Sequence, residues 1–496
     1  MQVITDLQLH SKYSRAVSQQ MTIPFIWDWA KRKGIDLVAT GDWTHPLWMR
    51  EIKSNLEEMG NGLLKLRTKN EELGTESGNI NDKWNDERKV NSADPLFLLA
   101  TEVSSIYSQG GKLRRIHTLI WSPSLTTCDK INKAFLDRGC NLIADGRPII
   151  GLSSIQVAEL VFSIDPTCLV IPAHAWTPWF SLYGSESGFD SIDEAFGSYA
   201  KYIYAIETGL SSDPAMNWRI KELDNRSIVS FSDAHSGPKL GREATVFDLQ
   251  ELSFNSIRQA IVNGRNTNNK ISYTIEFYPE EGKYHYTGHR NCGIKQTPSE
   301  TKQKGVICPV CGRKLTIGVM HRVEQLAGRG EGELKIKKSR LSGISRQQSR
   351  ILGNAGTHAV IPIQSGTASG QELSGIKMQG IFSEAFPDRP PYVMLVPLQE
   401  ILAESLGGLP TSQRVQDEYK KLTDHFGDEF AVLLRTATSD IEKISGLKVA
   451  EGIHKVRTGD IVVDPGYDGV FGVVKIWGED GKLKKEEKPK EQLSLF

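Results

Sequence analysis

The sequence predicts an α/β protein built from several domains, and three observations support this. The chain has 496 residues, more than one ordinary domain needs. Short apolar segments alternate with amphipathic segments up to about residue 265, as is typical of the strands and helices of an α/β sheet or barrel. After that point the composition changes, first to a cysteine-rich window and then to a stretch rich in Gly, Ser and charge.

The alternation begins with a strand, a helix and a second strand. The segments are MQVITDLQL, IPFIWDWAKRKG and IDLVATGD. Pro24 suits the first turn of the helix, and Gly34 suits its end. Later strand-like segments are LFLLATEVS, RRIHTLIWS, TCLVIPAHA, YIYAIETG and RSIVSFSDAH, and NSIRQAIVNG predicts the last helix of this domain.

Composition also predicts the domain boundaries. We expect an α/β domain at 1–265 with a polar surface insertion at about 67–94, a zinc-binding domain at 266–327, a linker or mobile segment at 328–386, a small C-terminal α+β domain at 387–478 and a flexible tail at 479–496. The segment PGYDG at 465–469 is predicted to be a hairpin turn, with a DNA-facing loop as the alternative.

Charge and cysteine content exclude several classes of protein. The 60 basic and 60 acidic residues balance, so any contact with a polyanion must be local. The N-terminus lacks the pattern of a signal peptide, and no apolar run approaches the roughly 20 residues of a membrane span. Six cysteines in so long a chain are too few for a disulfide scaffold. We therefore expect a cytoplasmic protein.

Histidine and acidic residues fall at successive predicted strand ends, with one of them, His117, inside the fourth predicted strand. They are His10, Asp42, Glu102, His117, His174, Glu207, Asp233 and His235. Because the carboxyl ends of barrel strands meet on one face, these side chains are expected to gather there. Any one of them alone is more often a cap or a turn residue, but together they predict a site for more than one divalent cation. Such metals suit phosphoryl chemistry, since they stabilise charge on the attacking and leaving oxygens.

These motifs resemble a known family of hydrolases. The succession DLQLHS, ATGDWTHP, TEVS, RRIHTLI, IPAHAWTPWF, AIETGLSSDP and SFSDAHS is similar to the polymerase-and-histidinol-phosphatase (PHP) domain. Within it, GDWTHP, PAHAWTPWFS and ETGLSSDP resemble endonuclease Q, a family of DNA-repair nucleases. The resemblance implies a distorted PHP-type (β/α)7 barrel that hydrolyses DNA on the 5′ side of a deaminated base. Uracil, hypoxanthine and xanthine are the implied bases, with abasic sites as a further candidate.

The resemblance also implies roles for the motif residues. The metal ligands would be Gln8, His10, Asp42, Glu102, His117, His174, Asp233 and His235, holding two or three ions of zinc, manganese or magnesium. The catalytic residues would be Asp233, Glu102, His10 and His174. Glu102 would bridge metals, and Asp233 would orient or deprotonate the water. His45 would bind metal or contact phosphate.

Gln8 departs from the family motif, which has histidine at this position. An amide oxygen is a poorer ligand for zinc than imidazole. We therefore expect lower occupancy of one metal position.

A second candidate site lies in HRNCGIKQTPSETKQKGVICPVCGRKL. His289 and Cys292 have two residues between them, as do Cys308 and Cys311, and fifteen residues separate the pairs. Four nitrogen or sulfur ligands on two tight turns predict a structural zinc site. A cluster of free thiols is the alternative, and His285 or His321 could replace His289 as the fourth ligand.

Aromatic residues surround the metal motifs and are candidates for a base pocket. They are Trp43, Trp48, Trp176, Trp179, Phe180 and Tyr183. An enzyme that acts beside one abnormal base must extrude that base, and aromatic walls receive it. Core packing explains each of these residues equally well. Basic runs at Lys112–Arg115, Arg313 with Lys314, and Lys335–Arg340 are candidates for phosphate contact, although we favour a solvated face for the last run.

The C-terminal segment KPKEQLSLF ends in an apolar motif. An apolar segment on a loose charged tail can dock in a preformed groove. QLSLF resembles the motif with which bacterial repair proteins bind the sliding clamp, and the contacting residues would be Gln492, Leu493, Leu495 and Phe496.

Two other functions fit parts of the sequence. A PHP phosphatase acting on a small phosphoester would use the same ligands but needs neither the zinc cluster nor the tail. A non-catalytic DNA-binding adaptor with a decayed metal centre is suggested only by Gln8. A DNA-repair endonuclease accounts for all of these features.

Overall fold

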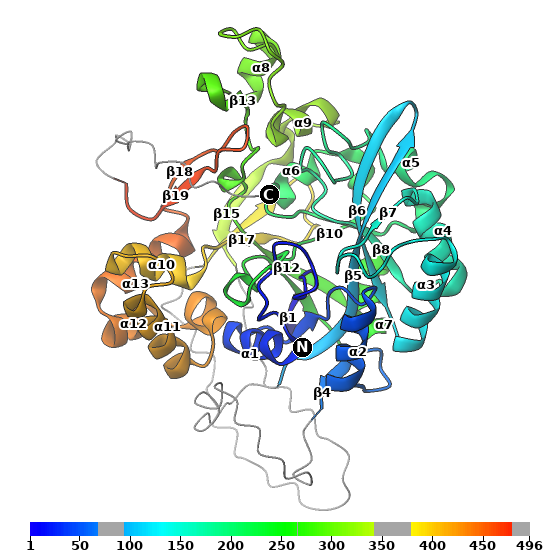
Figure 1. The fold of residues 1–496 in the computed structure, drawn as a ribbon. Coiled ribbons are helices and arrows are strands. Elements are labelled where there is room, and N and C mark those ends of the chain that lie inside the picture. The colour runs from blue at the N-terminus through cyan, green and yellow to red at the C-terminus, as the bar shows by residue number, and fades with distance from the viewer. Residues whose placement is uncertain (68–93, 265, 342–377, 479–496) are drawn as a thin grey trace, which may run out of the picture.

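The computed structural model describes residues 1–67, 94–264, 266–341 and 378–478. The predicted α/β class is confirmed, because helices surround one large mixed sheet and smaller modules lie beside it (Figure 1). Most of the predicted insertion, the middle of the predicted linker and the whole tail with its QLSLF motif lie outside the described residues.

The large sheet is formed by thirteen strands. They are β1 (Gln2–Asp6), β2 (Leu37–Ala39), β3 (Leu56–Glu58), β4 (Leu64–Leu66), β5 (Leu96–Gln109), β6 (Lys112–Ser122), β7 (Ile149–Ile150), β8 (Leu169–Pro172), β11 (Ala244–Asp248), β12 (Lys270–Glu276), β15 (Ile336–Arg340), β16 (Gln379–Ser383) and β17 (Tyr392–Met394). The helices of this region are α1 (Ile23–Lys33), α2 (Pro46–Asn55), α3 (Leu125–Asp137), α4 (Ser154–Ile164), α5 (Ile192–Phe196), α6 (Pro214–Trp218) and α7 (Phe254–Asn263).

The first unit forms as predicted. β1 and β2 are parallel neighbours, and α1 connects them. Pro24 lies in the first turn of α1, and Gly34 ends the helix with a φ of 83°. Glycine takes this left-handed conformation without a steric penalty, which explains why the helix stops there.

Further strands bring later loops beside the loop after β1. β2 is parallel to β5, β5 forms a long hairpin with β6, and β6 pairs with β8. β9 (Ala205–Glu207) and β10 (Ser227–Val229) form a separate parallel pair. Backbone bonds link this pair to the rest, because Ala175 N–H donates to Glu207 O at 3.0 Å and His10 N–H donates to Ala234 O at 3.0 Å. The loops after β1, β8, β9 and β10 therefore lie together.

Two predicted domain boundaries are wrong. β12 lies beyond residue 265 but pairs with β11, so the large sheet extends into the predicted zinc-binding domain. β15 and β16 lie within the predicted linker at 328–386, yet they pair with each other at the end of the same sheet. β15 consists mostly of exposed polar residues. A polar strand at a sheet edge resembles a linker in composition, which explains the error.

A small module follows β12 and comprises β13 (Thr287–His289), β14 (Ile294–Gln296), α8 (Pro298–Lys304) and α9 (Val319–Leu326). The C-terminal part contains α10 (Leu398–Leu406), α11 (Gln413–Phe426), α12 (Thr438–Ser445), α13 (Leu447–Thr458) and a hairpin of β18 (Val462–Asp464) and β19 (Val473–Lys475). PGYDG thus forms the predicted hairpin turn, and its Gly466 N–H donates to Glu280 O at 2.8 Å. Among the helices of the described residues, none is both long and apolar enough to cross a membrane.

Candidate metal centre

The candidate ligands come from loops and from one hairpin. His10, His174 and Asp233 lie in the loops that follow β1, β8 and β10. Glu102 and His117 lie inside β5 and β6. The prediction that a strand ends at Glu102 is wrong, because β5 continues to Gln109 as one arm of the hairpin.

Three of the candidate residues have an unusual backbone conformation. Asp42, His174 and Asp233 have φ values of 41°, 28° and 47°. Left-handed backbone is uncommon for residues other than glycine, and such strain gathers at functional sites. These turns direct side chains from neighbouring loops toward one another.

The structure forms two groups of potential metal ligands, from the loops after β1, β8 and β10 and from the β5–β6 hairpin. One group is His10, Asp233 and His235, and the other is Glu102, His117 and His174. Within each group, one ligand atom from every residue lies within 4.8 Å of the others. His10 Nε2 is 3.2 Å from Asp233 Oδ1, and His117 Nδ1 is 3.1 Å from His174 Nε2.

Glu102 belongs to the second group and also reaches the first. Its Oε2 is 3.3 Å from His10 Nε2, and its Oε1 is 2.5 Å from His117 Nδ1. A carboxylate that reaches both groups fits a bridging ligand. Imidazole and carboxylate donors in these numbers suit divalent zinc or manganese.

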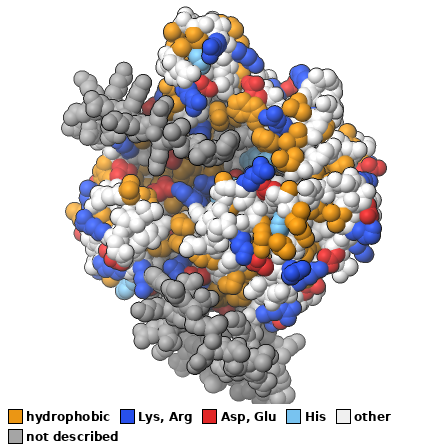
Figure 2. Space-filling model, in the orientation of Figure 1, with side chains coloured by type: hydrophobic (Ala, Val, Ile, Leu, Met, Phe, Trp, Pro, Cys, Tyr) orange, Lys and Arg blue, Asp and Glu red, His pale blue; other side chains and the backbone are white. Residues whose placement is uncertain are grey.

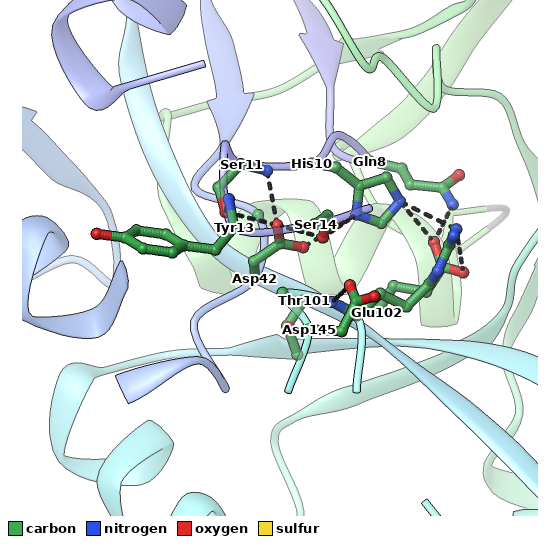
Figure 3. Close-up of polar contacts among 12 residues, drawn as sticks. Gln8, His10, Ser11, Tyr13, Ser14, Asp42, Thr101, Glu102 and Asp145 are labelled. Atoms are coloured by element: carbon green, nitrogen blue, oxygen red, sulfur yellow. Dashed lines mark hydrogen bonds and ion pairs between the residues drawn. The ribbon is translucent and has the colours of Figure 1, made fainter. Parts of the chain in front are cut away.

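Gln8 and Asp42 contact the groups without belonging to either. Gln8 Nε2 donates to Glu102 Oε2 at 2.7 Å, and among the described residues its buried Oε1 has no hydrogen-bond partner. Asp42 Oδ1 is 2.9 Å from His10 Nδ1, while Asp42 Oδ2 accepts from the backbone N–H and hydroxyl of Ser11. Figure 3 shows Gln8 and His10 directed toward Glu102, with Asp42 on the other side of the His10 ring. Asp42 thus orients His10, in the way that outer carboxylates orient metal-binding histidines.

His45 and Glu207 have supporting contacts instead of positions among the ligands. His45 caps α2 by accepting from Trp48 N–H at 3.4 Å, and its ring is 3.2 Å from the carbonyl oxygen of Ile143. Glu207 Oε2 accepts from the backbone N–H of His174 at 2.8 Å. The structure therefore gives no support to His45 as a metal ligand.

The charges of the site depend on burial and on close neighbours. Burial would raise the pKa of Glu102, but the charges of His117 and Arg147 hold it well below its usual value. Burial lowers the pKa of His117 to about 4. Burial would also lower the pKa of His10, but the charge of Asp42 raises it well above its usual value. Burial raises the pKa of Glu207 well above its usual value. Ionised Glu102 and neutral His117 are the protonation states that bind metals.

Four of the six aromatic candidates belong to the core. Trp43, Trp48, Trp176 and Tyr183 are fully buried. Trp48 Nε1 donates to the backbone oxygen of Gly41 at 2.9 Å, and Trp176 Nε1 donates to Asn217 Oδ1 at 2.7 Å. The burial of these four residues favours the core-packing alternative over the predicted base pocket.

The other two aromatic candidates are partly exposed beside the ligands. Phe180 packs on His117 with ring centroids 4.9 Å apart. Trp179 contacts Tyr284 edge to face at 5.4 Å, which joins the loop after β8 to the small module. In the orientation of Figure 2, hydrophobic side chains gather below the module that contains β13 and α8, and the surface is hollowed there.

The basic runs differ in their surroundings. In the Lys112–Arg115 run, the Arg115 guanidinium lies 5.5 Å from the Phe180 ring, close to the candidate ligands. Arg313 and Lys314 are exposed on the small module. Lys335–Arg340 lies mainly in the exposed edge strand β15, in agreement with the favoured solvated face.

The second site gathers the expected four residues. His289, Cys292, Cys308 and Cys311 place ligand atoms within 4.8 Å of one another. His289 Nδ1 is 3.3 Å from Cys311 Sγ, whereas the alternative His285 bonds the carbonyl oxygen of Pro279. Desolvation would raise the pKa of the Cys308 thiol, but hydrogen bonds from the backbone N–H groups of Cys311 and Val310 lower it to about 6. A thiolate in this position suits zinc.

Arg147 is a site residue that the sequence analysis missed. Its guanidinium NH1 is 3.5 Å from Glu102 Oε1 and 3.4 Å from His10 Nε2. Arg147 belongs to the turn-like segment DGRP, 145–148, between α3 and α4. This segment could have indicated it, but a search for histidine and acidic residues does not select an arginine.

Sequence comparisons place the chain among several relatives. A family model described as the MJ0043 C-terminal domain matches residues 397–460. Protein MJ0043 of Methanocaldococcus jannaschii is 28% identical over 321 residues, which cover 63% of this chain and 33% of that protein. Protein YqxK of Bacillus subtilis is 26% identical over 366 residues, covering 73% of this chain and 74% of that protein. The chain thus spans about a third of the length of the first of these relatives.

Two solved structures match almost the whole chain. The lesion-specific endonuclease PfuEndoQ from Pyrococcus furiosus has a TM-score of 0.71 and 28% identity, covering 96% of this chain and 95% of that one. Over this length the chain is similar in structure to an endonuclease Q. The second structure is endonuclease Q in complex with a 27-mer duplex that has an abasic lesion at the active site. It has a TM-score of 0.72 and 29% identity, and the match covers 98% of this chain and 99% of that chain. The resemblance to endonuclease Q inferred from the motifs is confirmed.

Proposed function

We propose that the protein is a metal-dependent DNA-repair endonuclease that cuts on the 5′ side of a deaminated base. The observation with the most weight is the endonuclease Q likeness over nearly the whole chain. Uracil, hypoxanthine and xanthine are the proposed bases. Abasic sites are a further proposed substrate, suggested by the lesion in the related complex.

The two ligand groups, with Glu102 in contact with both, support a binuclear or trinuclear centre on a PHP-type barrel. Divalent metals held there would activate a water molecule and stabilise charge on phosphoryl oxygens. Hydrolysis forms a bond between the water oxygen and phosphorus and breaks one P–O ester bond, which leaves one alcohol end and one phosphate end.

The residues of this chain arrange the reactants. Glu102 holds the two groups at a fixed separation, since it contacts His10 on one side and His117 on the other. Asp42 fixes the His10 ring through Nδ1. Asp233 is more exposed than Glu102, which supports a role for its carboxylate in orienting the attacking water.

DNA would approach across the small module and the C-terminal hairpin. Trp179 and Tyr284 form an aromatic link from the ligand loop to that module. Phe471 is 64% exposed, and Lys283 Nζ lies 4.4 Å from its ring. Aromatic rings with nearby cations suit stacked bases and phosphates. We propose that the cysteine cluster binds one structural zinc and that QLSLF binds the sliding clamp.

A nicking assay tests this function. Labelled duplexes with one uracil, one hypoxanthine, one abasic site or no lesion would be incubated with manganese, magnesium or zinc. We expect a cut 5′ to the lesion that is lost with chelator and falls by about 100-fold or more in Asp233→Asn, because one ligand is weakened.

Asp137→Asn is the matched control, since Asp137 lies on the exposed face of α3 and pairs only with Lys133 among the contacts described for it. Undiminished cutting by Asp233→Asn would exclude the proposed centre. Hydrolysis of small phosphoesters without DNA cutting would favour the phosphatase, and retention of DNA binding without metal would favour the adaptor.

A further inference from the structure

Arg147 places a positive charge at the edge of the candidate metal centre. NH1 is 3.5 Å from Glu102 Oε1 and 3.4 Å from His10 Nε2. The side chain is 23% exposed, so it lies at the wall of the site and still reaches solvent. An arginine remains charged at every physiological pH.

The segment that contains Arg147 is fixed from both sides. Gly146 N–H donates to Tyr13 O at 3.0 Å, and Pro148 O accepts from Ser104 N–H at 3.0 Å. A Cβ at Gly146 would lie 2.4 Å from Asp42 Oδ2, so only glycine permits this approach. The backbone beside Arg147 therefore passes close to the carboxylate that orients His10.

Structural arginines in this protein have closer partners. Arg329 makes two bonds to the carboxylate of Asp224, and Arg389 NH2 lies 2.5 Å from Asp224 Oδ1. By contrast, the contacts described for the Arg147 guanidinium use NH1 alone and are long. A guanidinium has five N–H donors in a planar fork that fits phosphate oxygens. Donors of Arg147 thus remain available for an anion.

The presence of Gln8 gives a reason for a permanent positive charge, that of Arg147, at this edge of the site. The neutral amide of Gln8 donates to Glu102 Oε2, where the related motif has a histidine. With one imidazole ligand fewer, metal occupancy beside Glu102 is expected to be lower, and so is the positive charge there. Arg147, on the Oε1 side of the same carboxylate, supplies charge that does not depend on metal occupancy.

We propose that Arg147 binds a non-bridging oxygen of the scissile phosphodiester and is a catalytic residue of this centre. This inference rests on the proposed function. Charge on the phosphoryl oxygens is stabilised by a preorganised cation as water adds and the ester bond breaks. Arg147 transfers no proton, and the atoms of the hydrolysis are unchanged.

The test compares native protein with Arg147→Ala and Arg147→Lys. We expect the single-turnover nicking rate of Arg147→Ala to fall by about 100-fold. Free guanidinium ion should restore part of that rate, and Arg147→Lys should retain more activity than Arg147→Ala. Metal content per chain, measured by plasma mass spectrometry, should equal that of the native protein. Arg15→Ala is the control, because Arg15 is 79% exposed and pairs with the neighbouring Asp145.

Three results would overturn the proposal: an unchanged rate in Arg147→Ala, no response to guanidinium, or loss of metal from the variant, which would make Arg147 a support for Glu102. If native protein nicks no duplex, the proposed function fails separately. Calorimetric titration of the metal-loaded proteins with inorganic phosphate then decides the role of Arg147. We expect about tenfold weaker phosphate binding by Arg147→Ala, and equal binding would refute the proposal.

Discussion

Gln8 is the residue at which the metal motif of this chain is unusual. Its amide nitrogen bonds Glu102, while its buried Oε1 has no hydrogen-bond partner among the described residues. We expect Gln8→His to bind zinc about tenfold more tightly at the strand-end centre, since imidazole is a better zinc ligand than an amide oxygen. Competition with a chromogenic chelator measures this affinity.

His45→Gln is a suitable control for the effect of histidine count, because His45 caps α2 and lies outside both ligand groups. Weaker zinc binding by Gln8→His would show that the native amide is an adapted part of the site.

At this scale, the sequence predicted which residue types gather but not what each side chain touches. His10, Glu102 and His117 were found because they are polar groups in or directly after predicted apolar strands. The role of Asp42 was not predictable, because it depends on a left-handed backbone that aims its carboxylate at His10. Arg147 was missed because its position depends on contacts far away in the chain.

At the scale of elements, the small module that contains the cysteine cluster is a short segment with few buried apolar residues of its own. Its ligands lie on two turns, at His289–Cys292 and Cys308–Cys311. Metal ligation is therefore expected to supply much of its local stability.

We expect Cys308→Ser to lose one zinc ion per chain and to unfold this module locally while the large sheet stays folded. Metal analysis and hydrogen exchange measure the two effects. Cys128→Ser is the control, because Cys128 is buried in α3, away from the module. Unchanged zinc content in Cys308→Ser would refute the ligand assignment.

Elements with a strong local pattern were predicted well, and elements defined by pairing were not. α1 has its proline start and glycine end where predicted. β15 and β16 were assigned to a linker, because their strand character comes from pairing with each other and with β17. The local sequence of a short polar segment does not show which distant strand it will pair with.

At the scale of the whole molecule, a buried ion pair fastens the C-terminal helices to the first unit. Lys33 Nζ is 2.7 Å from Glu429 Oε2, and the two side chains are 2% and 4% exposed. The hydroxyl of Tyr419 donates to the same oxygen at 2.8 Å. Removing one partner leaves a buried charge unpaired.

We expect Lys33→Met to lower the free energy of unfolding by about 3 kcal/mol, and Lys33→Met with Glu429→Gln to cost less than the single change. Urea denaturation measures both. Lys31→Met on the same helix is the control and should cost at most about 1 kcal/mol, because the Lys31 pair with Asp94 is partly exposed. A double variant less stable than Lys33→Met would contradict the argument.

The central claim is that the strand ends bind divalent metals. The most direct measurement is an anomalous difference map from crystals loaded with zinc or manganese. We predict peaks between His10, Asp233 and His235 and between Glu102, His117 and His174, with a zinc peak at the cysteine cluster as the internal reference. A peak at the cysteine cluster with none at either strand-end group would contradict the account.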